Sequence, residues 1–177
     1  ILAKLPHRVL YKPYPHAEGR FLDPDPCLVA AQAAVNIEVH KDHKDLSLLL
    51  PDARLIITAR ATSTLGWCMA TRRPIVFIDM PYSCPLLPEL RESVANGVFL
   101  FDSSDSTFRT ELLRFLAQPL SVIEGKHAAT KTEGRERLLE KYYMGTRDGA
   151  GIQAADELEK TTQVYVSEST QCLKPDL

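Results

Sequence analysis

Two short apolar runs that show no polar alternation, residues 55–57 and 75–78, most strongly limit how this chain can fold. The first reads Leu-Ile-Ile, the second reads Ile-Val-Phe-Ile, and a segment of helical length, residues 65–71, lies between them. Strands that are apolar on both faces are typical of parallel sheets covered by helices on both sides. The stretch 51–79 is therefore predicted to form a strand, a helix and a second, parallel strand.

Strand-like and helix-like segments alternate along the rest of the chain. Further strands are predicted at residues 8–11, 36–39 and 98–101. Helices are predicted from Asp45 to residue 50, over 89–95, from Ser104 or Asp105 to 117, over 134–144 and over 152–165. Residues 27–35 fit either a helix or a buried strand. This order predicts an α/β, Rossmann-like fold with a mostly parallel sheet and helices on both faces.

Length and charge limit the class of protein. The chain has 177 residues, of which 45% are hydrophobic, and a net charge of −2. This charge and the lack of a basic block argue against nucleic acid as a partner. No apolar run reaches the roughly 20 residues that span a bilayer. A cytoplasmic location is predicted, with a peripheral association at the inner face of the membrane left open.

The predicted domain covers residues 1–165, and residues 166–177 form a polar tail that is expected to be flexible. Because the first residue is Ile1 and not methionine, residues are expected to be missing upstream.

The cysteine and histidine spacings do not indicate a metal site. The four cysteines are widely scattered, which favours reduced thiols over a disulfide scaffold or a zinc site. His40 and His43, with Asp42 and Asp45, fit no zinc spacing and are interpreted as a solvated charged turn. No metal and no cofactor are therefore predicted.

The strongest candidate site is the hydroxyl cluster Thr62, Ser63 and Thr64. It falls where the predicted strand ends and the helix begins, and free N–H groups and the helix dipole favour an anion there. Arg60 precedes the cluster and is a candidate to pair with a phosphate. The alternative is an ordinary helix cap, which serine and threonine supply routinely.

Other candidates lie after other predicted strands. Lys12 can neutralise a phosphate, and His16 can serve as an acid, a base or a nucleotide contact. Asp79 and Glu89 are candidates for hydrogen bonds to a ribose. For each of them a structural explanation is also open: Lys12 and His16 as solvated loop residues, Asp79 as the end of its strand, and Glu89 as a helix start.

Several motifs together resemble a known family. They are the Lys12-Pro13-Tyr14-Pro15 loop, the D-L-x-x-L-L-P-x-A pattern at 45–53, the Ser63-Thr64 pair, the R-P-I-V-F-I-D run at 73–79 and the turn at 142–149. In this order they resemble the C-terminal domain of GT-B glycosyltransferases, closest to capsule-type Kdo transferases and teichoic-acid glycerophosphotransferases. The resemblance covers roughly residues 8 to 160 and implies a nucleotide-sugar (donor) binding domain.

The resemblance also implies roles for residues. Ser63 and Thr64, with Thr62, match a hydroxyl pair that holds a donor phosphate. Lys12 and Pro15 match the lysine and proline of a K-x-H-P loop on the donor. Tyr14 stands at the histidine position of that loop, and His16 lies two residues further on. A CMP-linked donor is one option that the resemblance leaves open.

The function predicted from these residues is transfer of a glycosyl group from a nucleotide sugar to a bacterial surface glycan or glycolipid. No catalytic base is identified. The acceptor-binding N-terminal domain of the family is expected to be missing, so that the isolated fragment is expected to be inactive. The alternatives are a glycerophosphotransferase, a nucleotide-sugar epimerase, and a non-catalytic module that binds an anion or a partner protein.

Overall fold

A computed structural model describes residues 1–13, 25–40, 44–59, 61 and 63–144 of the chain. The chain forms two compact units, Ile1–Leu138 and Leu139–Leu177. The first unit holds both sheets. Of the second unit, the structure describes the end of helix α7 and a π-helical turn, Glu140–Met144. Residues 145–149 of the turn motif, the helix predicted at 152–165 and the tail lie outside the described residues.

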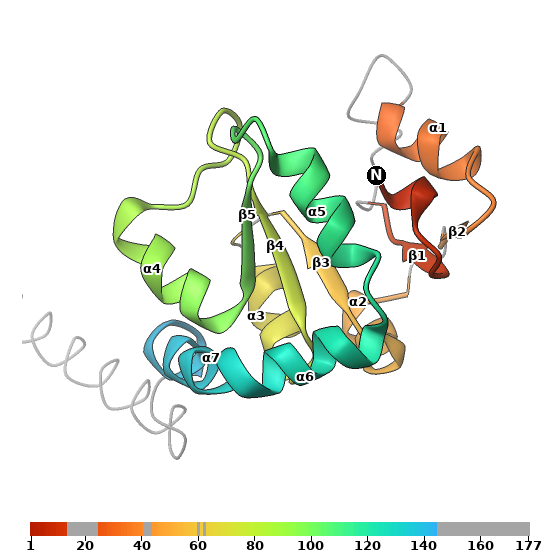
Figure 1. Ribbon diagram of the computed structural model, residues 1–177. Coiled ribbons are helices and arrows are strands. Elements are labelled where there is room, and N and C mark those ends of the chain that lie inside the picture. The colour runs from red at the N-terminus through yellow and green to blue at the C-terminus, as the bar shows by residue number, and fades with distance from the viewer. Residues whose placement is uncertain (14–24, 41–43, 60, 62, 145–177) are drawn as a thin grey trace, which may run out of the picture. The chain divides into compact units, whose positions relative to one another are not determined.

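The first unit is an α/β structure with parallel strands in two small sheets flanked by helices, as predicted (Figure 1). The strands are β1 (Val9–Tyr11), β2 (Ile37–Val39), β3 (Ile56–Thr58), β4 (Ile75–Asp79) and β5 (Phe99–Asp102). β1 pairs with β2, and β3, β4 and β5 form a second sheet in that order; every pair is parallel.

The helices begin and end near signals in the sequence. They are α1 (Pro26–Gln32), α2 (Leu46–Leu49), α3 (Ser63–Ala70), α4 (Pro88–Gly97), α5 (Phe108–Leu116), α6 (Leu120–Thr130) and α7 (Thr132–Leu139), with short 3₁₀ turns at Leu2–Lys4 and Leu50–Asp52. Asp25 and Asp45 cap α1 and α2 by accepting hydrogen bonds from the backbone N–H groups of Cys27 (2.9 Å) and Ser47 (2.8 Å). The segment 27–35, which fitted a helix or a strand, is therefore helical.

Two helix predictions need correction. The helix expected to start at Ser104 or Asp105 starts at Phe108, because the Asp105 carboxylate caps a separate turn through the N–H of Thr107 (2.7 Å). Helix α6 was not predicted, and the helix expected over 134–144 is α7 followed by the π-helical turn. In α6 only Ile123 and His127 are buried, so its apolar stripe is too narrow to stand out in the sequence.

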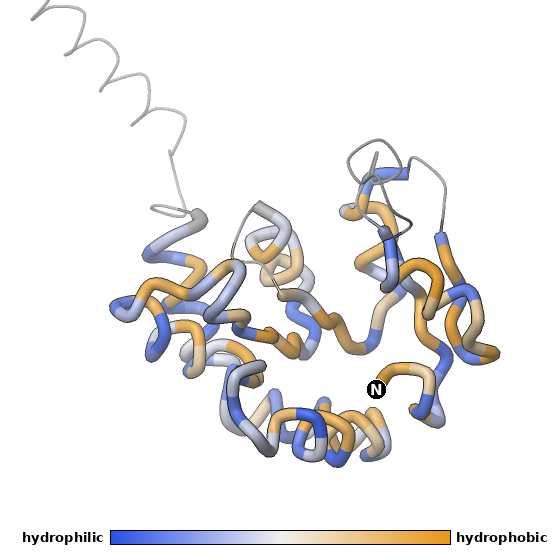
Figure 2. Tube along the Cα trace, turned by 90° about the horizontal axis from the view of Figure 1, so that it is seen from above, coloured by the Kyte–Doolittle hydropathy of each residue, from blue (hydrophilic) through white to orange (hydrophobic). Residues whose placement is uncertain are grey.

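Strand alternation divides the core between the two faces of the larger sheet. On one face, Val76 packs with Leu112 and Leu116 of α5 and with Leu5 of the N-terminal segment. Ile75 and Phe77 point to the opposite face and are fully buried. Figure 1 shows α5 in front of this sheet and α3 behind it, and Figure 2 shows apolar residues (orange) and polar residues (blue) alternating around the flanking helices.

Helix α3 is held at its C-terminal end by a buried arginine. Arg135 of α7, only 3% exposed, donates from Nε to the carbonyl of Met69 (2.9 Å) and from Nη1 to that of Arg73 (2.6 Å). Its Nη2 also bonds the carbonyls of Cys68 and Met69. Besides Arg135, the carbonyl of Cys68 accepts from the N–H (3.2 Å) and the hydroxyl (2.7 Å) of Thr71, and that of Met69 accepts from the N–H of Arg72 (3.4 Å). The helix dipole favours a cation at this end of α3.

His127 of α6 completes this arrangement. Its Nε2 lies 3.1 Å from Nη1 of Arg135. Because the guanidinium can only donate, the facing imidazole nitrogen accepts, and His127 is neutral. Burial lowers the pKa of His127, and the charges of Arg135 and Lys131 lower it further. Burial also lowers the pKa of Arg135 to about 10, so the arginine stays charged at neutral pH.

The start of α7 fits tightly against the end of α4. A Cβ placed on Gly134 would lie 2.3 Å from the carbonyl oxygen of Asn96, closer than any side chain can come. Lys131 also donates to the carbonyl of Ala95 (2.5 Å). Glycine at 134 therefore allows the backbone contact that brings Arg135 under α3.

Within the part of the chain that the structure describes, no helix is both long and apolar enough to cross a membrane.

We expect Arg135→Met to lower the free energy of unfolding by about 3 kcal/mol, because it removes a buried guanidinium that donates to the carbonyls of Cys68, Met69 and Arg73. Urea denaturation would measure the change. The control is Arg137→Met, two residues further along α7, which removes an exposed pair with Glu133 and should cost less than about 0.5 kcal/mol. Equal losses in the two variants would contradict this role of Arg135.

The free energy of unfolding should fall as the pH drops from about 7 to about 5. The pKa of His127 is lower in the folded chain than in the unfolded chain, so below about pH 6.5 the unfolded chain binds more protons than the folded one. The contribution is fully present above the unfolded pKa and is lost as His127 is forced to ionise beside Arg135. His127→Gln keeps an acceptor for Arg135 but cannot titrate, so its urea midpoint should vary less over this range. An unchanged slope in that variant would show that other groups cause the dependence.

Candidate functional site

The carboxyl ends of β3, β4 and β5 meet at one edge of the larger sheet. Asp79 and Asp102, the last residues of β4 and β5, are register partners, and Thr58 ends β3 opposite Phe77. Ligands of open parallel sheets bind at this edge. The loops that follow β3, β4 and β5 start at this edge, whereas the loop after Tyr11 belongs to the β1–β2 sheet.

An arginine joins the two aspartates at this edge. Arg91 of α4 bonds the buried carboxylate of Asp79 through Nη1 and that of Asp102 through Nη2 (2.6 Å). Asp102 also accepts from the N–H (2.9 Å) and the hydroxyl (2.5 Å) of Ser104. The Ser104 hydrogen bonds, followed by Arg91, lower the pKa of Asp102. Two carboxylates around one guanidinium leave this cluster with a net negative charge.

The loop after β4 is held firmly against this cluster. Met80 and Cys84 form an antiparallel bridge, and the N–H groups of Ser83 (3.0 Å) and Cys84 (2.9 Å) donate to the carbonyl of Met80. The N–H of Leu86 donates to the second oxygen of Asp79 (3.1 Å). Asp79 therefore bonds both the loop and Arg91, which is the structural role left open for it beside ribose binding.

The hydroxyl cluster stands at the start of α3. The helix begins at Ser63, and Thr64 is half-buried in its first turn. Arg60, Thr62 and the side chain of Ser63 lie outside the described residues. The order of strand, short connection and helix at the carboxyl edge is as predicted, although the helix begins two residues earlier than expected.

The remaining candidates are spread over two elements. Lys12 follows β1, and its charge contributes to lowering the pKa of Asp45, behind the hydrogen bonds from Ser47. Tyr14, Pro15 and His16 lie outside the described residues. Glu89 is exposed in the first turn of α4. The structure thus brings Asp79 and the start of α3 to one sheet edge, and Lys12 to the same end of the other sheet.

Arg91, Asp102 and Ser104 were missed as members of this edge. A signal was present in the sequence, since Asp79 and Asp102 both directly follow an apolar strand. Adjacent parallel strands put such residues side by side. Two neighbouring carboxylates require a cation, which points to an arginine early in the intervening helix.

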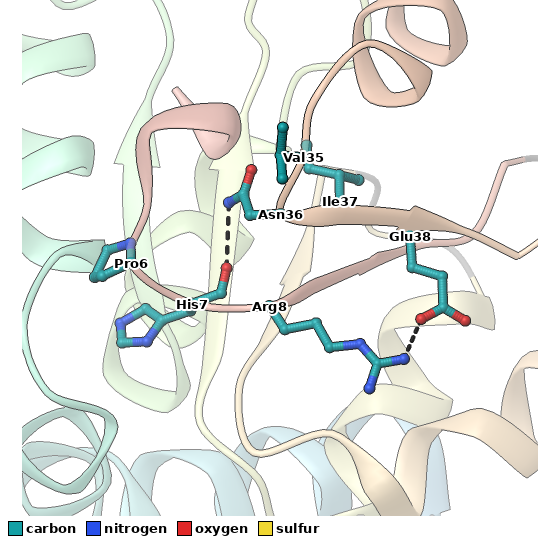
Figure 3. Close-up of a pocket in the computed structure, with 7 residues that line it drawn as sticks. All are labelled: Pro6, His7, Arg8, Val35, Asn36, Ile37 and Glu38. Carbon is teal, nitrogen blue, oxygen red and sulfur yellow. Dashed lines mark hydrogen bonds and ion pairs between the residues drawn. The ribbon is translucent and has the colours of Figure 1, made fainter.

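The cavity in Figure 3 lies at the opposite end of its strands. It has a volume of about 330 Å³ and is lined by residues that precede or begin β1 and β2. The Asn36 amide in its wall donates to the carbonyls of Leu2 (3.0 Å), Leu5 (3.1 Å) and His7 (3.2 Å). Arg8 and Glu38 form an exposed ion pair beside it. These polar groups are committed to holding the N-terminal segment, so the cavity is not our candidate site.

The described residues offer no metal centre, and the thiol of Cys68 is not activated. No group of three or more His, Cys, Asp or Glu among them is arranged to hold a metal ion. Cys68 is buried, and burial raises the pKa of its thiol to about 11, which leaves it protonated and unreactive at neutral pH.

No family model, no curated protein and no solved structure matches this chain.

We expect Arg91→Met to destabilise the protein by about 2 kcal/mol, because it leaves the buried carboxylate of Asp79 without its counter-charge. The double variant Asp79→Asn/Arg91→Met should recover part of this loss, since the neutral amide needs no cation. Urea denaturation of the parent, both single variants and the double variant would measure the coupling. Strictly additive losses would contradict a direct interaction between the two side chains.

Proposed function

We propose that this chain binds the nucleotide-sugar donor of a glycosyltransferase that extends a bacterial surface glycan or glycolipid. The observation that carries the proposal is the connection from β3 to α3, in which Ser63 and Thr64 open a helix at the carboxyl edge of a parallel sheet. The motifs shared with GT-B donor domains support the same function.

The start of α3 suits a phosphate for two reasons. Its first N–H groups have no partner within the helix, and the helix dipole places partial positive charge there. Serine and threonine hydroxyls add donors at the same point. In glycosyl transfer the departing group is a nucleotide phosphate, so donors held in place there stabilise the charge that develops on it.

The neighbouring Asp79–Arg91–Asp102 cluster disfavours a phosphate and can instead bind the sugar of the donor. Its net negative charge repels a phosphate and so directs that group towards α3. Asp102, whose side chain is 28% exposed, and Ser104 can instead accept from and donate to sugar hydroxyls. An acceptor site and a general base would come from a further domain. We place the enzyme in the cytoplasm, in peripheral contact with the inner face of the membrane.

A nucleotide that fits this site should raise the melting temperature of the chain. We would measure thermal unfolding with CMP, CDP, UDP, GDP and ADP, for the parent and for Ser63→Ala/Thr64→Ala. We expect one nucleotide to give a clear shift in the parent, and the shift to be lost in the double variant because the phosphate loses its hydroxyl donors.

The matched control is Ser121→Ala, which removes a hydroxyl from the first turn of α6. That helix follows α5 and starts at the amino end of the sheet, so the nucleotide shift should be retained. If no nucleotide protects the parent chain, or if the double variant is protected as well as the parent, the hydroxyl pair is only a helix cap and the proposal fails.

A further inference from the structure

The β1–β2 sheet also has a carboxyl edge, and two chemically active residues meet there. Tyr11 and Val39 are register partners at the ends of the two strands, and the N–H of His40 donates to the carbonyl of Tyr11 (2.9 Å). The ladder therefore continues past β2 and puts His40 beside Lys12. Because side chains alternate along strands, Lys12 and His40 extend from the same face.

His40 differs from the other histidines of the described residues in its hydrogen bonding. Its Nε2 is buried and, within the part of the chain that the structure describes, is the one buried side-chain nitrogen or oxygen without a hydrogen-bond partner. In contrast, Nε2 of His7 donates to the carbonyl of Gln118 (3.1 Å), and that of His127 accepts from Arg135. Nε2 of His40 is therefore not solvated as predicted, and residues 41–43 of the predicted turn lie outside the described residues.

A buried polar atom without a partner is unfavourable and marks a place where a ligand, an ion or a water belongs. Lys12 lies at the adjacent strand end, and its ammonium group favours an anionic ligand oxygen. The acidic groups near this edge are Asp45, whose pKa Lys12 lowers, and Asp25, which acts on Tyr11. His40 also lies at the carboxyl end of its strand, which is the end where parallel sheets bind ligands. A neutral imidazole can donate through Nε2 to such an oxygen.

We propose that His40 is a ligand-binding residue whose Nε2–H donates to a phosphate oxygen of the bound nucleotide, with Lys12 supplying the neighbouring positive charge. This proposal rests on the proposed function and names a contact that the hydroxyl pair of α3 does not provide. A phosphate oxygen in this position would satisfy the buried nitrogen, which the described residues leave unsatisfied.

The test compares His40→Leu with His7→Leu on the whole chain. Isothermal titration would measure binding of inorganic pyrophosphate and of the nucleotide that protects the parent best, and thermal unfolding would measure stability without ligand. For His40→Leu we expect about tenfold weaker binding of both ligands, as for the loss of one hydrogen bond to a charged group. Its melting temperature without ligand should be unchanged or higher, because an unsatisfied buried nitrogen is removed.

His7→Leu should do the opposite, since it breaks the hydrogen bond to Gln118 and leaves the ligand untouched. Its melting temperature should fall and its affinities should stay as in the parent. His40→Gln, which keeps an amide near the position of Nε2, should retain more affinity than His40→Leu. Ring ¹⁵N spectra would give a second readout, in which pyrophosphate shifts the Nε2 signal of His40 and not that of His7.

The outcomes separate this inference from the proposed function. If nucleotide binds the parent and is lost in Ser63→Ala/Thr64→Ala but is unchanged in His40→Leu, the inference on His40 is overturned and the proposed function stands. A lower melting temperature of His40→Leu with parental affinity would likewise assign His40 a purely structural role. If neither pyrophosphate nor any nucleotide binds the parent, both proposals fall.

Discussion

The described structure depends above all on the contact of Arg135 with the end of α3. A buried guanidinium is costly to desolvate, and here the cost is offset by carbonyls at the C-terminus of a helix and by the accepting nitrogen of His127. The same arginine bonds the carbonyl of Arg73, which leads into β4. One side chain therefore fixes where α3 ends and where the central strand begins, and α7 can supply it only because Gly134 lets the backbones touch.

This contact has a consequence for the other end of the same helix. Helix α3 is short and opens at the sheet edge where a phosphate is proposed to bind. A helix terminus stabilises an anion only when its N–H groups are held in place, since mobile donors must first be ordered. The anchor at the C-terminus and the buried Leu65 and Met69 between the two ends restrain α3 as a rigid unit. Residues of α6 and α7 thereby support a site that they do not line.

The sequence predicted the strands and the short helices well because their signals are local. Apolar runs without alternation gave the parallel strands, and Asp45 gave the cap of α2. The site was less predictable, because its members meet only through tertiary structure. Asp79 was recognised, but its partners Arg91 and Asp102 lie twelve and twenty-three residues further along the chain. The Arg135 contact spans 66 positions to Met69, and no local pattern announces it.

The histidines show why burial alone says little about function. His7 and His127 are each matched by a partner within the protein, so their burial is explained by the fold. His40 lies at the strand end where parallel sheets receive ligands, and its nitrogen is matched by nothing among the described residues. A protein that only needed to fill this space would be served better by an apolar side chain of similar size. Retaining an imidazole there costs stability, and a ligand oxygen is the partner that would compensate for it.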